Sequence, residues 1–172
     1  MAQLTSERLG LVVDAIVGAR RVDAYGVGAS GLVAMDMAQK LLRIGMSSHA
    51  FQDAHLALTS AVLLKPGDVA IGISTSGETP DVLEPLGRAG EAGATTVAIT
   101  NNPRSSIAEL AEHVLISAGR ETEFRPAAMA SRISQLVMVD CVFVGVAQRT
   151  FDSSQEALQS TRQAVAEFVK KR

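Results

Sequence analysis

Short apolar runs alternate along this chain with longer segments in which apolar residues recur at helical spacing. The short runs predict five β-strands, at residues 22–25, 47–51, 69–73, 95–100 and 113–117. The longer segments predict helices at residues 5–20, 32–44, 54–64, 80–92, 105–111, 127–148 and 153–171. Strands that alternate with helices are typical of a parallel sheet covered on both faces, and near-continuous apolar strands fit that burial. The sequence therefore predicts an α/β fold, a three-layer αβα sandwich around a five-stranded parallel sheet.

Turn and capping residues mark the ends of several of these elements. Thr5 or Ser6 can cap the first helix, and Gly45 and Gly93 lie where two later helices should end. The segment Lys-Pro-Gly-Asp at 65–68 predicts a turn into the third strand. The chain has no internal repeat, linker or low-complexity segment, so we expect residues 1–172 to form a single domain.

The last third of the chain has a different character. The helix predicted at 127–148 is apolar almost all round, which favours burial in the domain core or at a subunit contact. The final helix, at about 153–171, has a narrower apolar stripe through Leu158, Val165, Phe168 and Val169. Its basic end, Lys170 to Arg172, suits the negative end of a helix dipole and is too small to predict a nucleic-acid surface.

Composition and charge exclude several classes of protein. The formal net charge of −2 gives no basic field for nucleic acid. Cys141 is the one cysteine, which excludes a disulfide framework; it lies in an apolar run and is expected to be an inert core thiol. No spacing of His, Asp and Glu suggests a metal centre, and we expect no cofactor. No signal peptide opens the chain and no apolar run approaches the roughly 20 residues of a membrane span, so we expect a cytoplasmic protein without a membrane partner.

The hydroxyl-rich turn at residues 74–79, Ser-Thr-Ser-Gly-Glu-Thr, is the strongest candidate for chemistry. It joins a buried strand to the start of a helix, where free backbone N–H groups and the helix dipole favour an anion. Ser74, Ser76 and Thr79 can donate to anionic oxygens, and Gly77 lets the backbone approach closely. The simpler interpretation is that Ser76 or Thr79 caps the helix and Gly77 only makes the turn. Three hydroxyls in six residues favour a phosphate cradle.

A second glycine turn, Gly26 to Gly31, follows the first predicted strand. It does not meet the dinucleotide pattern Gly-x-Gly-x-x-Gly, because Gly31 comes one residue early. Asp53 lies near the place of a ribose-binding carboxylate, but Ser30 in the turn favours phosphate over a nucleotide. Right-handed crossovers place the carboxyl ends of all strands at one edge of the sheet, so both turns should adjoin there.

These two turns resemble the SIS (sugar isomerase) domain. In that family Gly-x-Gly-x-Ser after the first strand and Ser-x-Ser-Gly-x-Thr after the third surround a phosphosugar. The chain supplies these positions in order, as Gly26, Gly28, Ser30, Ser74, Ser76, Gly77 and Thr79. The resemblance implies a flavodoxin-like fold and a phosphorylated sugar as ligand.

Within that family the chain is most similar to the effector-sensing domain of RpiR-type transcriptional regulators. The similarity includes Lys40–Gly45, Asp53–His55, Glu121–Arg125 and Ala128–Arg132. Such regulators carry a helix-turn-helix domain before this one, and about twenty residues precede the first strand here. The resemblance therefore implies a sensing domain that reaches DNA only through a helix-turn-helix domain missing from this chain. It further implies a homodimer or a dimer of dimers.

The resemblance also supplies roles for charged residues outside the two turns. It implies that Glu121 faces the sugar hydroxyls, and that Arg125 or Arg132 is a charge partner for ligand or carboxylate. The simpler interpretation is that these charged residues form an ion-pair cluster on the surface. An alternative function is a small aldose–ketose phosphate isomerase, with Glu121 as the base and His55 assisting. His55 could instead be a core histidine beside a helix-capping Asp53.

Overall fold

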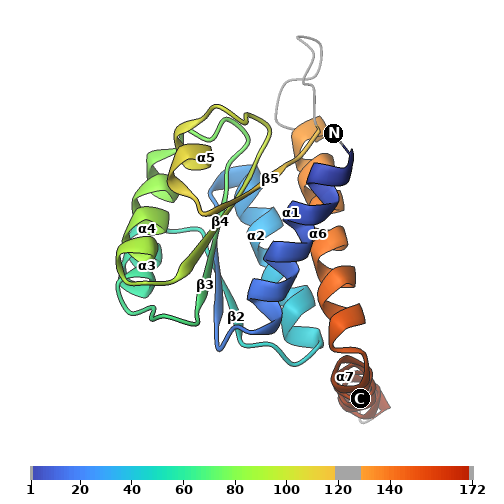
Figure 1. The fold of residues 1–172 in the computed structure, drawn as a ribbon. Coiled ribbons are helices and arrows are strands. Elements are labelled where there is room, and N and C mark those ends of the chain that lie inside the picture. Colours follow the sequence, from blue (N-terminus) through green and yellow to red (C-terminus); the bar gives the residue numbers. More distant parts are fainter. Residues whose placement is uncertain (1, 119–128, 171–172) are drawn as a thin grey trace.

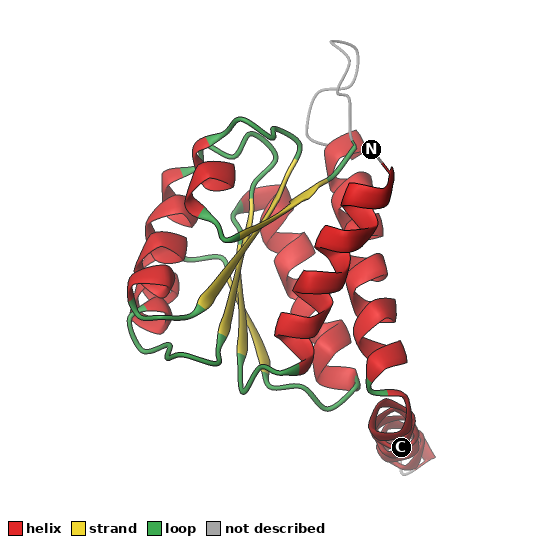
Figure 2. Ribbon diagram, viewed as in Figure 1, coloured by secondary structure: helices red, strands yellow, loops and turns green. Residues whose placement is uncertain are grey.

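The computed structural model describes residues 2–118 and 129–170. Within them, five strands and seven helices alternate, as Figures 1 and 2 show. The strands are β1 (Val22–Tyr25), β2 (Ser48–Phe51), β3 (Val69–Ile73), β4 (Thr95–Thr100) and β5 (His113–Ile116). The helices are α1 (Ala2–Val17), α2 (Gly28–Arg43), α3 (Ala54–Ala61), α4 (Pro80–Glu91), α5 (Ser106–Leu110), α6 (Met129–Arg149) and α7 (Phe151–Lys170).

All strand pairs are parallel and the sheet order is β2-β1-β3-β4-β5, which confirms the predicted three-layer α/β sandwich. Helices α1, α2 and α6 cover one face of the sheet, and α3, α4 and α5 cover the other (Figure 1). Helix α7 extends away from the sheet beyond the end of α6 (Figure 1). Each face of the sheet thus has its own apolar core.

The order of the strands follows their apolar character. Every residue of β1 and of β3 is buried, as expected for strands covered on both sides. The edge strand β2 is half-buried. Two helices end at glycines in the left-handed conformation, Gly45 with φ +85° and Gly93 with φ +90°, which confirms the predicted ends of α2 and α4.

Two predicted helix starts were wrong. Helix α1 begins at Ala2, so neither Thr5 nor Ser6 lies at its start. Helix α2 begins at Gly28, four residues before the predicted start, because the glycine turn itself winds into the first helical turn. Ser30, which was predicted to precede the helix, therefore lies in its first turn.

The helix predicted at 127–148 to be buried in the core or at a subunit contact has only one of its faces in the core of this chain. Its inner face is in the core, with Val139, Val142 and Val146 fully buried. Ile133 and Val137 on its outer face remain 58% and 56% exposed. An apolar helix that packs on one side only leaves its other side to solvent or to another subunit.

Two further expectations about this helix need correction. Cys141 is exposed on the outer face of α6, so it is not a core thiol. Residues 130–149 are long and apolar enough to cross a membrane by length and composition, although no such run was expected. The packing of α6 against α1 and α2 in the domain core accounts for the apolar residues on its inner face.

Candidate functional site

The two hydroxyl-bearing turns lie at the same edge of the sheet. Strands β1 and β3 are neighbours, with Tyr25 opposite Gly72, so the chain leaves both strands at the same level. The turn after β1 leads directly into α2, and the turn after β3 leads into α4. The N-termini of two helices therefore open beside each other at the carboxyl edge of the sheet, where parallel α/β sheets bind ligands.

In the turn after β3, hydrogen bonds hold the hydroxyls in place without capping α4. Buried Ser74 accepts from the Gly77 N–H at 3.0 Å, and its Oγ lies 2.9 Å from Thr79 Oγ1. Ser76 Oγ accepts from the Glu78 N–H at 3.2 Å. Thr79 is the N-cap residue of α4, but its side chain makes no capping hydrogen bond. The helix-capping interpretation of these hydroxyls is therefore not supported.

Gly77 is required by close packing as well as by its backbone conformation. Its φ is +75°, and a β-carbon placed on it would lie 2.1 Å from Ser105 Oγ. The Gly77 carbonyl accepts from the Ile107 N–H at 3.0 Å, which ties this turn to α5. Next to it, the Glu78 carboxylate accepts from the Ser106 N–H and hydroxyl, and those bonds lower the pKa of Glu78 below its ordinary value. Hydrogen bonds from α5 thus stabilise the turn.

The turn after β1 is equally constrained. Gly28 has φ +57°, in the left-handed region. A β-carbon on Gly26 would lie 2.5 Å from the backbone oxygen of Ser30, so this turn admits no side chain at that position. Ser30 is buried in the first turn of α2. The glycines therefore let the strand enter the helix within two residues, which places the Ser30 hydroxyl beside the β3 turn.

A buried amide, which the sequence interpretation missed, joins the two turns. Gln135 lies on α6 and is only 1% exposed. Its Oε1 accepts from the Ser30 hydroxyl at 3.5 Å, and its Nε2 donates to Thr75 Oγ1 at 3.2 Å. The available signal was a glutamine at an inward-facing position of an otherwise apolar helix, because a buried amide needs hydrogen-bond partners.

Asn101, at the end of β4, extends this network and was also missed. Its N–H donates to the Thr75 carbonyl at 3.2 Å, and its side-chain amide donates to the buried Ser131 hydroxyl at 3.2 Å. The Ser117 hydroxyl, after β5, donates to Asn101 Oδ1. Three strand ends and α6 are therefore connected by polar contacts at this edge of the sheet.

Some of the other predicted site residues do not belong to this hydrogen-bond network. Asp53 caps α3, accepting from the Leu56 N–H at 3.0 Å, and His55 is exposed in the first turn of that helix. Arg132 lies half-buried on α6, next to Ser131. Glu121 and Arg125 lie outside the described residues, so their predicted roles stay predictions. Among the described residues, no cluster of three or more His, Cys, Asp or Glu could hold a metal ion.

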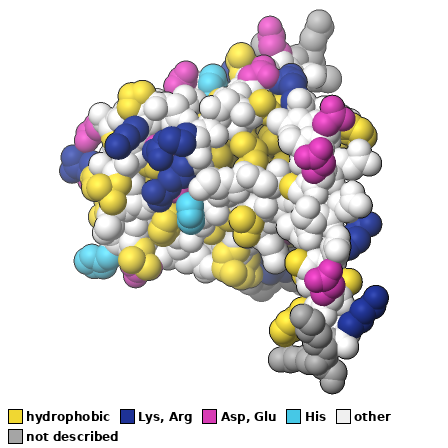
Figure 3. All heavy atoms as spheres, turned by 90° about the horizontal axis from the view of Figure 1, so that it is seen from below, with side chains coloured by type: hydrophobic (Ala, Val, Ile, Leu, Met, Phe, Trp, Pro, Cys, Tyr) yellow, Lys and Arg dark blue, Asp and Glu magenta, His cyan; other side chains and the backbone are white. Residues whose placement is uncertain are grey.

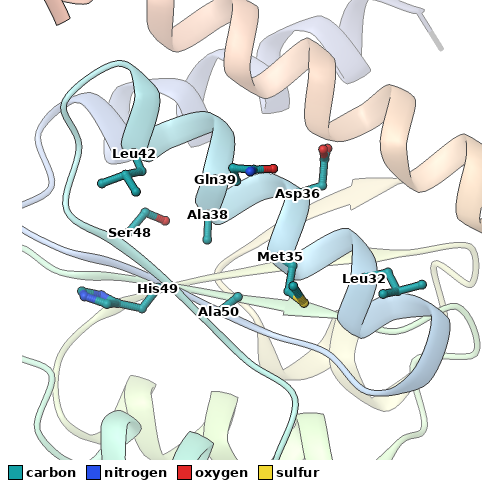
Figure 4. A pocket seen from close by; sticks show the side chains of 9 residues that line it. All are labelled: Leu32, Met35, Asp36, Ala38, Gln39, Leu42, Ser48, His49 and Ala50. Atoms are coloured by element: carbon teal, nitrogen blue, oxygen red, sulfur yellow. The ribbon is translucent and has the colours of Figure 1, made fainter. Parts of the chain in front are cut away.

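A separate groove of about 480 Å³ lies between α2 and the edge strand β2. Leu32, Met35 and Leu42 line it from the helix, and His49 lines it from the strand (Figure 4). None of the turn hydroxyls lines this groove. It is mostly apolar and open, which is unlike a site for a phosphate.

The fold and the two turns define a class of protein, a flavodoxin-like α/β domain with hydroxyl-bearing glycine turns where two helices begin. The SIS domain family model matches residues 15–145, and the chain belongs to that family. This confirms the family resemblance of the two turns.

The relatives of this chain include helix-turn-helix transcriptional regulators. It is 43% identical to the uncharacterized HTH-type transcriptional regulator TTE0211 of Caldanaerobacter subterraneus, over 96% of this chain and 59% of that protein. It is 37% identical to the HTH-type transcriptional regulator RpiR of Escherichia coli K12, over 87% of this chain and 50% of that protein. The chain thus spans between 50% and 59% of the length of these two curated relatives.

Solved structures give the same relationship. The NanR protein of Vibrio vulnificus, complexed with ManNAc-6P, superposes with a TM-score of 0.88 at 29% identity, covering 96% of this chain and 64% of that one. The sugar isomerase domain of the RpiR transcription factor from Sphaerobacter thermophilus gives 0.82 at 25% identity, covering 91% and 86%. One of these two similar structures therefore holds a phosphorylated sugar.

Proposed function

We propose that this chain is the effector-sensing domain of an RpiR-type transcriptional regulator and that it reversibly binds a phosphorylated sugar. The observation that carries the proposal is the pair of adjoining turns. Ser30 lies in the first helical turn of α2, while Ser74, Ser76 and Thr79 lie before α4. The similarity to NanR, a protein solved with ManNAc-6P, supports a phosphosugar as the ligand class.

In this proposal the phosphate lies between the N-termini of α2 and α4. Their free backbone N–H groups and dipoles favour the dianion, and the turn hydroxyls donate to its oxygens. Gly28 and Gly77 let the backbone approach without a side chain in the way. Glu121, Arg125 and Arg132 are proposed to face the sugar, as the family resemblance implies. Isomerase turnover is not part of the proposal, because exposed His55 takes no part in the turn network.

A thermal-shift panel tests the ligand class. It contains ManNAc-6P, glucose 6-phosphate and arabinose 5-phosphate, each with its unphosphorylated parent, and inorganic phosphate and NAD. A ligand present at about 100 times its Kd stabilises by roughly 2.7 kcal/mol, which should raise Tm by roughly 5–11 °C for a domain of this size. We expect such a shift from at least one sugar phosphate and almost none from its parent sugar. An equal shift from both, or a larger shift from NAD, would contradict the proposal.

The partners of the chain follow from the same proposal. The curated relatives are longer helix-turn-helix regulators, so we assign contact with DNA to a helix-turn-helix domain outside the region that they share with this chain. A sensing role of this kind places the protein in the cytoplasm.

We also propose that the domain forms a homodimer through the outer face of α6. Ile133, Val137 and Val144 expose apolar side chains there, and the apolar stripe of α7 continues beyond it with Val165 and Phe168 exposed. Exposed apolar residues gathered on one side of a domain are typical of a subunit contact.

A further inference from the structure

The buried Gln135 amide is a polar group that the proposed ligand contacts do not use. It belongs to α6, whereas its two partners belong to α2 and to the turn after β3. Burying an amide costs free energy unless it is hydrogen-bonded, and both of its partners here are hydroxyls of the candidate site. A side chain that only filled space in this core would not need an amide.

The direction of the two hydrogen bonds has consequences for the site. Thr75 Oγ1 accepts a hydrogen bond from Gln135 Nε2, so the one proton of the Thr75 hydroxyl points elsewhere. Thr75 lies in the hydroxyl-rich turn and is partly exposed, so this proton is available to an anionic oxygen. The Ser30 hydroxyl donates to Gln135 Oε1 at 3.5 Å, the outer limit for such a bond. A phosphate oxygen would make a shorter, charge-assisted bond to that proton.

We propose that Gln135 is a positioning residue of the phosphosugar site. It keeps the Thr75 hydroxyl in the orientation that donates to the ligand, and it holds the Ser30 hydroxyl only weakly until a phosphate oxygen accepts a hydrogen bond from it. It acts through these two hydroxyls and does not itself touch the phosphate. This inference rests on the proposed function.

Two isosteric substitutions separate this role from simple packing. Gln135→Glu places a carboxylate that accepts from both hydroxyls and repels the phosphate, so we expect affinity to fall roughly 10- to 150-fold. Gln135→Met fills the same space and removes one neutral hydrogen bond to each hydroxyl, so we expect a loss of roughly 2- to 10-fold. Gln148→Glu makes the same charge change on the exposed part of the same helix and should leave affinity within about 2-fold.

Isothermal titration calorimetry measures these affinities with ManNAc-6P as the probe, or with whichever sugar phosphate gives the largest thermal shift. Inorganic phosphate as a second probe reports on the phosphate part alone, and we expect it to be weakened by Gln135→Glu as well. Wild-type-like affinity in Gln135→Glu would overturn the positioning role while leaving the proposed function intact. Absence of binding by the wild-type chain to every sugar phosphate would overturn both.

A double-mutant cycle with Thr75→Val gives a readout that packing alone would not move. Valine keeps the shape of threonine but has no hydroxyl for Gln135 to orient. If Gln135 acts partly through that hydroxyl, the effect of Gln135→Met on affinity becomes clearly smaller when Thr75→Val is already present. If the loss of affinity in the double variant equals the product of the losses in the two single variants, the positioning role is overturned. The test needs only the Met and Val variants, so it holds even where Gln135→Glu does not fold.

Discussion

The hydroxyls of the β3 turn are not equivalent, because they differ in burial. Ser74 is only 2% exposed and accepts from the Gly77 N–H, whereas Ser76 is exposed and bonds only a neighbouring N–H. Ser74 therefore supports the shape of the turn in addition to its proposed contact with the ligand. Exposed Ser76 makes a smaller contribution to the folded structure.

Ser76→Ala should weaken sugar-phosphate binding roughly 10- to 150-fold, because one hydrogen bond to a charged group is lost. Its free energy of unfolding should change by no more than about 0.5 kcal/mol. Ser74→Ala should weaken binding and also destabilise the fold by about 1–3 kcal/mol, since the buried Gly77 N–H loses its acceptor. Calorimetry and urea unfolding measure the two effects. Unchanged affinity in both variants would refute the phosphate cradle.

Gly77 and Gly67 share a left-handed backbone but differ in their surroundings. Gly67 has φ +90° and open space where a β-carbon would be, whereas at Gly77 that space is taken by Ser105. Gly67→Ala should cost about 1–2 kcal/mol for the backbone alone. Gly77→Ala should cost more, by about 1–3 kcal/mol, because the turn must shift away from α5. Chemical denaturation of the two variants side by side measures the difference, and equal costs would show that the turn gives way freely.

At the level of elements, a buried ion pair holds β1 and α3 together. Asp23 is fully buried in β1 and receives two hydrogen bonds of 2.8 Å from Arg21, and Ser60 of α3 donates to it as well. This cluster lies at the amino edge of the sheet, away from the two hydroxyl-bearing turns. Figure 3 shows Lys and Arg side chains grouped on that side of the molecule. The pairing allows a charge to remain in the interior.

Asp23→Asn should destabilise the domain by about 1–3 kcal/mol, because the part-buried Arg21 guanidinium loses its charged hydrogen-bond partner. Glu84→Gln is the matched control, since Glu84 pairs with Arg88 on the exposed surface of α4. That pair is exposed to solvent, so its loss should destabilise the domain much less than the loss of the Asp23 pair. Guanidinium unfolding curves compare the two variants. A cost for Asp23→Asn no larger than that for Glu84→Gln would mean that the buried pair contributes no more than the surface pair.

For the whole molecule, the face proposed for the dimer contact is formed by the exposed apolar residues of α6 and α7. Cys141 is exposed on the same helix as the apolar residues of this face and reports on its accessibility. If two copies meet there, a charge in the middle of the face should separate them, because an unpaired carboxylate in an apolar contact is costly.

Val137→Glu should convert the dimer to a monomer at micromolar concentration and speed the reaction of Cys141 with a thiol reagent. Leu56→Glu is the control, because Leu56 is comparably exposed but lies on α3, on the opposite side of the sheet. Light scattering coupled to size-exclusion chromatography measures the mass. A monomeric wild-type protein would contradict the proposed dimer. A dimer that persists in Val137→Glu but is lost in Leu56→Glu would place the contact on the side of α3.

The sequence by itself determined the alternation of elements and the bounds of three strands. Strands β1, β3 and β4 begin and end where predicted, because each is an apolar run closed by glycine, proline or hydroxyl-rich turns. The turns that follow β1 and β3 carry the candidate site, so the order of residues along the chain is enough to single out Ser30, Ser74 and Thr79. Chain direction and right-handed crossovers alone bring such turns to one edge.

Only the tertiary structure decided which faces of the helices are covered and which distant groups meet. An apolar pattern on α6 does not say that Val139 packs inward while Val137 and Cys141 remain outside, since that depends on where α1 and α2 lie. Gln135 and Ser30 are 105 residues apart and meet only because α6 packs against α2. Contacts between elements far apart in sequence depend on tertiary packing, and the local propensities of the residues do not determine them.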